Sequence, residues 1–324
     1  LDYLFDPTIP YEGKASFERV TGLLQVDEDG YYYYDSTKNF AAFDERNNQF
    51  HLYTQPGVPG RNTDITSTGQ FFPFNTPDQV FKFDNGVFTP KIVDDVRGEL
   101  PENLPDNSDA MNRMPFINHY FGMTMTTRFA QRNGGTTYRG EETTYEFSGD
   151  DDVWVFIDDV LVAALGGIHN AASLSINFAT GDVIITNFNK WTGQEEHVKS
   201  TIREQFVKAG ESADGIKYVD TVTWGEGEKE NTFADDTYHT LRFFFMERGN
   251  NESNVKLKFN MVVIPESQIL KTDQAGNSVD GAKFELYPAD EDYTIIDDPI
   301  KSGTTENGKL PLLDDETGGP LAFA

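Results

Sequence analysis

The feature that most constrains the fold of this chain is a succession of short segments in which apolar and polar residues alternate. Gly, Asn and Asp, which favour turns, separate these segments. They include Phe50–Tyr53, Val80–Phe83, Thr124–Phe129 and Thr144–Phe147. The aromatic run Tyr31–Tyr34 and a late pair, Leu241–Phe245 and Val255–Phe259, are further predicted strands. A period of two is typical of strands with one buried face. The sequence therefore predicts an all-β fold, an antiparallel sandwich or barrel.

One segment has a different period and predicts a helix between His197 and Ala209. Its apolar residues recur four positions apart, and Gly210 follows where a helix could end: Val198, Ile202 and Phe206. We expect an inserted amphipathic helix that covers an edge or face of the sandwich. A ligand role for Trp191 or Trp224 beside this helix is the alternative.

The charge of the chain limits its partners. The 324 residues include 54 acidic and 26 basic side chains, a net charge of −28. Such a surface repels nucleic acid and anionic lipid headgroups. It suits a protein that stays soluble outside cells or collects divalent cations. We expect no nucleic-acid partner and no membrane insertion.

Cysteine is absent, which removes disulfides, thiolate nucleophiles and Cys-based zinc sites. No stretch approaches the roughly 20 apolar residues of a membrane helix. The chain opens at Leu1 without a basic and apolar leader, so we interpret it as a mature or trimmed chain and infer export from other features.

The most informative segment is an acidic run that enters an apolar strand. Asp150, Asp151 and Asp152 directly precede Val153–Ile157, which is apolar on both faces and predicts a central strand. Adjacent like charges are unfavourable unless a cation lies between them. Ca²⁺ takes roughly 6 to 8 oxygen ligands, and the amide-rich segment 248–254 could supply the remainder. A solvated turn at the entrance to a strand explains the same residues.

The segment Phe147–Asp158 resembles the signature of the fibro-slime domain, a bacterial relative of the protective-antigen-type (PA-fourteen) β-sandwich. The resemblance spans roughly residues 1–265. It includes these further segments: Gly30–Ser36, Asn118–Met123, Leu165–His169, Ile176–Gly181, Phe244–Gly249 and Ser253–Asn254.

That resemblance implies a calcium ion held by an Asp-Asp pair with a cis peptide bond, and sugar hydroxyls that bind the calcium. The pair falls on Asp150 and Asp151. Asn250, Asn251 or Asn254 would supply the side-chain oxygen from the second loop. Many relatives have Gly where this chain has Asp152, which adds charge beside the predicted sugar site. The predicted ligand-binding residues are Asp150, Asp151, Asp152 and Asn251.

Two further positions have simpler explanations. His169 follows two glycines, but no nucleophile or second metal ligand accompanies it, so we expect a hydrogen-bonded structural residue. Asp158-Asp159 follows the apolar strand. A second acid pair is one interpretation of these residues, and a hairpin turn that leads to Val160–Val162 is the simpler one.

The last segment, residues 266–324, predicts a small or partial second β-sandwich. It resembles the start of a Cna-B-type (SpaA-like) stalk domain of Gram-positive adhesins and pilins, through Leu270–Asp273, Gly281–Tyr287 and Asn307–Leu310. The resemblance implies that Lys271 forms an isopeptide bond with a late-strand Asn if the natural protein continues past Ala324. An ordinary surface lysine is the alternative.

These observations favour a secreted, non-enzymatic surface adhesin module that binds a cell-surface or plant-fibre glycan through calcium. The alternative is a structural pilin or stalk component in which calcium only stabilises the fold and other surface-protein subunits are the partners. A cell-wall attachment would require a sorting signal. Glycosidases need two carboxylates about 5–10 Å apart across a cleft, and adjacent aspartates do not supply that spacing.

Overall fold

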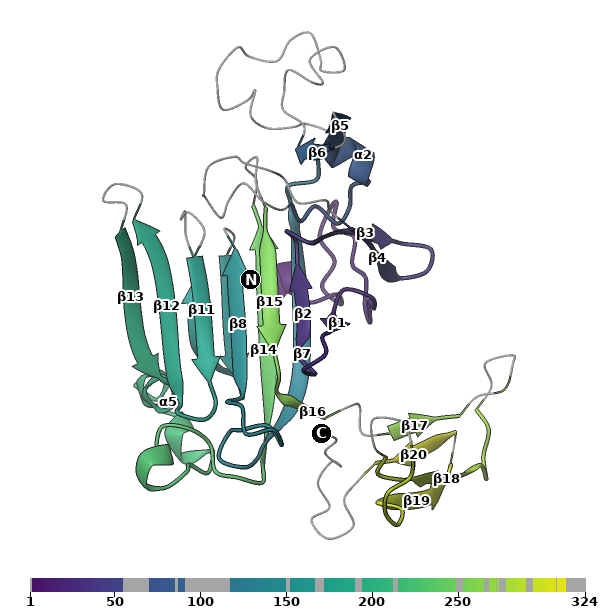
Figure 1. Cartoon of the computed structure of the whole chain (residues 1–324), viewed down its shortest axis with the longest axis vertical. Helices are drawn as coiled ribbons and strands as arrows, with labels where there is room; N and C mark the ends of the chain where they lie inside the picture. The colour runs from purple at the N-terminus through teal and green to yellow at the C-terminus, as the bar shows by residue number, and fades with distance from the viewer. Residues whose placement is uncertain are drawn as a thin grey trace. The chain divides into compact units, whose positions relative to one another are not determined.

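The computed structural model divides the chain into two compact units (Figure 1). Unit 1 comprises 1–127 and 131–261, and unit 2 comprises 128–130 and 262–324. The structure describes residues 2–54, 70–84, 87–90, 117–149, 152–166, 172–189, 194–211, 215–248, 253–264, 268–271, 273, 278–289, 294–306 and 308–312.

Two antiparallel sheets build the sandwich, which confirms the predicted all-β class. The seven-stranded sheet contains, in spatial order, β1 (Gln25–Val26), β2 (Tyr32–Asp35), β15 (Val255–Phe259), β8 (Thr144–Gly149), β11 (Ala172–Asn177), β12 (Asp182–Asn189) and β13 (Gln194–Thr201). The five-stranded sheet contains β10 (Val160–Leu165), β9 (Asp152–Ile157), β14 (Thr237–Glu247), β7 (Phe121–Gln131) and β16 (Val262–Ile264).

Short elements surround these sheets. Two hairpins pair β3 (Asn39–Asp44) with β4 (Gln49–Thr54) and β5 (Phe81–Asp84) with β6 (Val87–Pro90). The short helices are α1 (Asp2–Phe5), α2 (Pro77–Val80), η3 (Tyr218–Asp220) and η4 (Gly227–Lys229). Among the described residues, no helix has the length and apolar character needed to cross a membrane.

Aromatic side chains fill the space between the two sheets. The Phe147 ring of β8 lies 5.5 Å from the Phe243 ring of β14, centroid to centroid, and Tyr145 lies 6.2 Å from the same ring. The alternation along each strand sends these residues inward. Burial raises the pKa of the Tyr145 hydroxyl well above its ordinary value.

Strand β9 has apolar neighbours on both faces, as its sequence predicts. Val153, Val155 and Ile157 are completely buried on the inner face. On the outer face, the ring of Phe5 from α1 lies 6.4 Å from Trp154. A strand covered on both sides needs no polar alternation, which explains its uniform composition.

The predicted helix is present but begins later than expected. Helix α5 spans Ile202–Ala209, and Thr201 caps it by accepting a 3.1 Å hydrogen bond from the Glu204 N–H. Residues 194–201 form strand β13, so Val198 is not helical and is 57% exposed. Ile202 and Phe206 are buried, and the apolar spacing holds only for these two. The capping box (Thr201, Glu204) marks the true start.

The two late strands are not partners of each other. Strand β14 pairs with β9 in the five-stranded sheet, and β15 pairs with β2 and β8 in the seven-stranded sheet. Consecutive strands here lie in opposite sheets.

Unit 2 contains two short antiparallel pairs. Strand β17 (Gln268–Leu270) pairs with β20 (Lys309–Pro311), and β18 (Lys283–Leu286) pairs with β19 (Lys301–Thr304). Thr305 is buried and links them locally: its hydroxyl donates to the Val279 carbonyl (2.8 Å) and accepts from the Ala282 N–H (3.1 Å).

Candidate functional site

Segments that are distant in the sequence meet at one end of the seven-stranded sheet. Gly149, the last residue of β8, lies opposite Val255, the first residue of β15. On its other side, Gly149 lies opposite Ala172, the first residue of β11. Strands β15, β8 and β11 are therefore side by side (Figure 1). The acidic run follows Gly149 in the sequence, and the amide-rich segment 248–254 directly precedes Val255. The two segments therefore adjoin the same end of the sheet.

The backbones of these two segments are in close contact. A Cβ atom on Gly149 would lie only 2.4 Å from the Asn254 carbonyl oxygen and 2.7 Å from Cζ of Phe147. Any side chain at residue 149 would require the two strands to separate. The glycine before the acidic run is therefore a packing requirement.

Asp152 is the third carboxylate of the acidic run and is neutralised within the protein. It is the first residue of β9, and its side chain is 3% exposed. The Nε atom of Arg248 forms an ion pair with the Asp152 carboxylate, while the Arg248 side chain stays 54% exposed. A buried carboxylate is tolerated only when it is paired. The sequence alone did not identify Arg248 as this partner.

The segment that returns to β15 is fixed at its described end. Ser253 and Asn254 are both buried. The Ser253 carbonyl accepts a 2.7 Å hydrogen bond from the Phe71 N–H, and the Val255 N–H donates to the Ser36 hydroxyl (3.1 Å). Of the predicted metal ligands, Asn254 is the one that the structure describes.

The other predicted site residues lie outside the described residues. These are Asp150, Asp151, Asn250 and Asn251, together with the implied cis peptide bond, His169 and Trp191. Among the residues that are described, no group of three or more His, Asp or Glu side chains could hold a metal ion.

Two buried polar residues of β14 escaped the sequence interpretation, although the alternation could have revealed them. The inward positions of this strand run from His239 through Leu241, Phe243 and Phe245 to Glu247, and all five are buried. Glu247 directly precedes Arg248 at the end of the strand. An acid and a histidine on the inner face of a strand indicate local polar networks.

His239 lies between a hydroxyl and a carboxylate at the opposite end of β14. Its Nδ1 lies 2.6 Å from Asp158 Oδ2, and its Nε2 lies 2.7 Å from Thr237 Oγ1. The arrangement has the order of a nucleophile, base and acid. However, the Thr237 hydroxyl donates its proton to the Ala234 carbonyl (2.6 Å), so Nε2 does not accept that proton. We interpret the group as structural.

The same group holds the predicted hairpin turn, which the structure confirms. Asp158 and Asp159 have φ values of 47° and 68° between β9 and β10. Two positive φ values are typical of a type I′ turn. Asp158 Oδ1 also accepts the Thr240 N–H (2.8 Å), and Asp159 pairs with Arg242 at 2.7 Å.

Trp224 has a packing role beside the helix. Its ring stacks on Phe233 at 5.3 Å and lies edge-on to Phe206 of α5 at the same distance.

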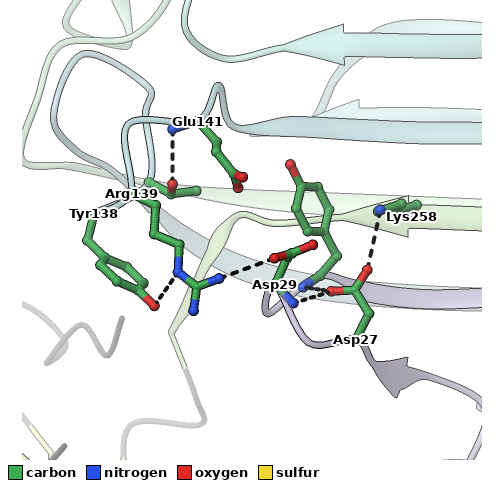
Figure 2. Close-up of polar contacts among 8 residues, drawn as sticks. Asp27, Asp29, Tyr138, Arg139, Glu141 and Lys258 are labelled. Atoms are coloured by element: carbon green, nitrogen blue, oxygen red, sulfur yellow. Dashed lines mark hydrogen bonds and ion pairs between the residues drawn. The ribbon is translucent and has the colours of Figure 1, made fainter. Parts of the chain in front are cut away.

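A second acidic turn, residues 27–30, pairs with basic side chains of the same chain (Figure 2). Asp27 accepts the N–H groups of Asp29 (3.1 Å) and Tyr31 (2.9 Å), and Lys258 Nζ lies 3.3 Å from its carboxylate. Arg139 reaches Asp29 at 3.3 Å. Lys258 also lies 4.0 Å from the centroid of the Tyr31 ring, within the range of a cation–π contact.

These contacts determine the titration of the turn. Burial opposes ionisation of Asp27, but the donors around it and Lys258 outweigh that effect and lower its pKa. Burial raises the pKa of Tyr31, and neighbouring carboxylates, led by Glu141, add to this rise.

Lys271, the predicted isopeptide residue, is half-buried in unit 2. Its backbone N–H donates to the Gly308 carbonyl (2.7 Å), and its carbonyl accepts the Val279 N–H (2.9 Å). These contacts place its backbone between β20 and the segment before β18, and the isopeptide bond stays a prediction.

Comparison with known proteins finds no matching family model. Three similar proteins of Dictyostelium discoideum are psiB, psiE and psiD. The chain is 32% identical to psiB over 149 residues, 45% of this chain and 24% of psiB. It is 32% identical to psiE over 150 residues (45% and 27%) and 45% identical to psiD over 125 residues (37% and 21%). The matched part thus spans about a quarter of these relatives.

Proposed function

We propose that unit 1 is a non-enzymatic, calcium-dependent glycan-binding module of a secreted surface adhesin. Asp150 and Asp151 would hold the calcium with an oxygen of Asn250, Asn251 or Asn254. The sugar, on a cell surface or plant fibre, would bind the calcium through neighbouring hydroxyls. A weak single site would gain avidity from surface display.

The observation that carries this proposal is the register of β8 and β15. Gly149 lies opposite Val255, so the acidic run begins where the amide-rich segment ends. The sequence predicts that these two segments share one cation, and the register brings their ends to the same end of the sheet. Hard cations prefer such oxygen-rich surroundings.

The ion pair of Asp152 and Arg248 refines the proposal. Because Arg248 compensates Asp152, the calcium would need to compensate only Asp150 and Asp151. Asp152 would then act as a positioning residue that anchors the acidic run to β14. This revises the expected direct role of Asp152 in ligand binding.

The test is a calorimetric calcium titration of the wild type, Asp151→Ala and Asp29→Ala. Asp29→Ala removes the same charge from the other acidic turn and serves as the control. We expect calcium binding in the wild type and the control, and its loss in Asp151→Ala. Calcium should also raise the unfolding temperature relative to EDTA. Absence of binding in the wild type, or equal weakening in both variants, would contradict the proposal.

A structural role for calcium in a pilin or stalk component is the second candidate. The burial of Asn254 favours it, because a calcium ion held by a buried ligand has less room for a sugar. A glycan-binding screen with and without calcium separates the two functions. Calcium-dependent retention that Asp151→Ala abolishes supports the adhesin; stabilisation without glycan binding supports the structural role.

A further inference from the structure

Three of the four outer strands of the sandwich are short or covered by a helix, and β13 is the exception. An exposed strand edge offers unpaired backbone groups, so proteins shorten or cover such edges. Among the described residues, β1 has two residues and β16 has three, and α5 packs against β10. Strand β13 has eight residues, and β12 is its only partner among the strands that the structure describes. It forms the free border of the seven-stranded sheet (Figure 1).

The first six residues of β13 are exposed on both faces of the sheet. Residues 194–199 are all exposed, and Val198 is 57% exposed. Its partner across β12 is Ile185, which is only half-buried. Val198 thus adds an exposed apolar side chain to a long strand edge.

The charges of β13 would normally prevent another strand from pairing with it. They fit one partner, however, which is a second copy of the same strand. If two β13 strands pair antiparallel about a two-fold axis at His197, Glu195 of each copy lies opposite Lys199 of the other. Directly opposite residues share a face and interact, so this register creates two Glu–Lys pairs. Lys199 forms no ion pair with a described residue of its own chain.

We propose that β13 is a self-association edge through which two copies of the chain join their seven-stranded sheets. A two-fold contact of this kind uses the same surface on both molecules. The register also places the two His197 side chains opposite each other, Gln194 opposite Ser200 and Glu196 opposite Val198, so no two carboxylates and no two lysines are directly opposite each other. The contact is small, so we expect a weak, concentration-dependent dimer.

The test measures association by sedimentation velocity over a protein concentration series. About 0.15 M salt screens the repulsion between two chains of charge −28 beyond about 8 Å. We compare the wild type with Lys199→Glu, Glu195→Lys, the double variant and an equimolar mixture of the two single variants. Lys283→Glu, an exposed residue of unit 2, controls for net charge. Circular dichroism and unfolding temperature confirm that each variant folds.

The set of variants that dimerise distinguishes the proposed Glu195–Lys199 pairing from a general effect of net charge. The wild type and Lys283→Glu should dimerise, and each β13 single variant should remain monomeric. The mixture should dimerise again, because the lysine introduced at position 195 of one chain then faces the glutamate introduced at position 199 of the other. The double variant should also dimerise, since it reverses both partners. A wild type that stays monomeric, or a mixture that associates no better than the single variants, would overturn the proposal. Both outcomes are independent of calcium and glycan binding.

Discussion

The two acidic segments of unit 1, the turn 27–30 and the run 150–152, look alike in sequence but differ in their surroundings. Asp27 is 29% exposed, and two backbone N–H groups and Lys258 satisfy it. Asp152 is 3% exposed and pairs with Arg248. The first segment is a self-contained solvated turn. In the second, the third carboxylate is buried and compensated, and two more carboxylates directly precede it. Burial and available cations, not acid content, distinguish a turn from a candidate metal site.

The largest expected difference concerns the glycines of the two segments. Gly149→Ala should lower the free energy of unfolding by about 3 kcal/mol, because the new Cβ would meet the Asn254 carbonyl at 2.4 Å. Gly30 has a φ of 84° and open space around it. Gly30→Ala should therefore cost only about 1 kcal/mol of backbone strain. Urea denaturation measures both, and equal costs would mean that the strands at Gly149 can separate easily.

A smaller difference is expected for the cations. Arg248→Ala removes the ion pair of the buried Asp152 carboxylate and should cost about 2 kcal/mol. Lys258→Ala leaves Asp27 partly solvated, with its backbone donors in place, and should cost about 0.5 kcal/mol. Thermal unfolding at neutral pH compares the two variants. If Arg248→Ala destabilises the protein less than Lys258→Ala does, Asp152 gains another partner in the variant. The two acidic segments would then not differ in their dependence on a basic side chain.

The smallest of the three expected differences in unfolding free energy concerns the pH dependence of the turn 27–30. The pKa of Asp27 is lowered in the folded protein from its ordinary 3.8. The ionised form thus contributes stability that is present above pH 3.8 and is lost as the pH falls through the folded value. Asp27→Asn keeps the shape and should cost about 1 kcal/mol at neutral pH. The difference in unfolding free energy between the wild type and Asp27→Asn should vanish in acid. Denaturation curves at several pH values measure it, and a difference that stays constant with pH would contradict a role for the charge.

Local patterns were sufficient to predict several parts of this molecule. Alternation predicted the strands around Thr144–Phe147 and Thr124–Phe129, because a strand with one buried face requires it. The apolar strand Val153–Ile157 and the turn at Asp158-Asp159 were also correct. The helix was located only in part. Val198 matched the helical spacing, but the capping box at Thr201 and Glu204 ends the strand and begins α5.

The sequence by itself therefore determined the all-β class, the buried faces of its strands and the acidic and amide-rich segments, because these depend on neighbours along the chain. The tertiary structure decided that β14 and β15 lie in opposite sheets, that Gly149 meets Asn254, and that Arg248 compensates Asp152. It also decided that β13 lies at the edge of the seven-stranded sheet among the described strands. Each of these depends on which strands become neighbours in space, and many strand orders satisfy the same alternation equally well.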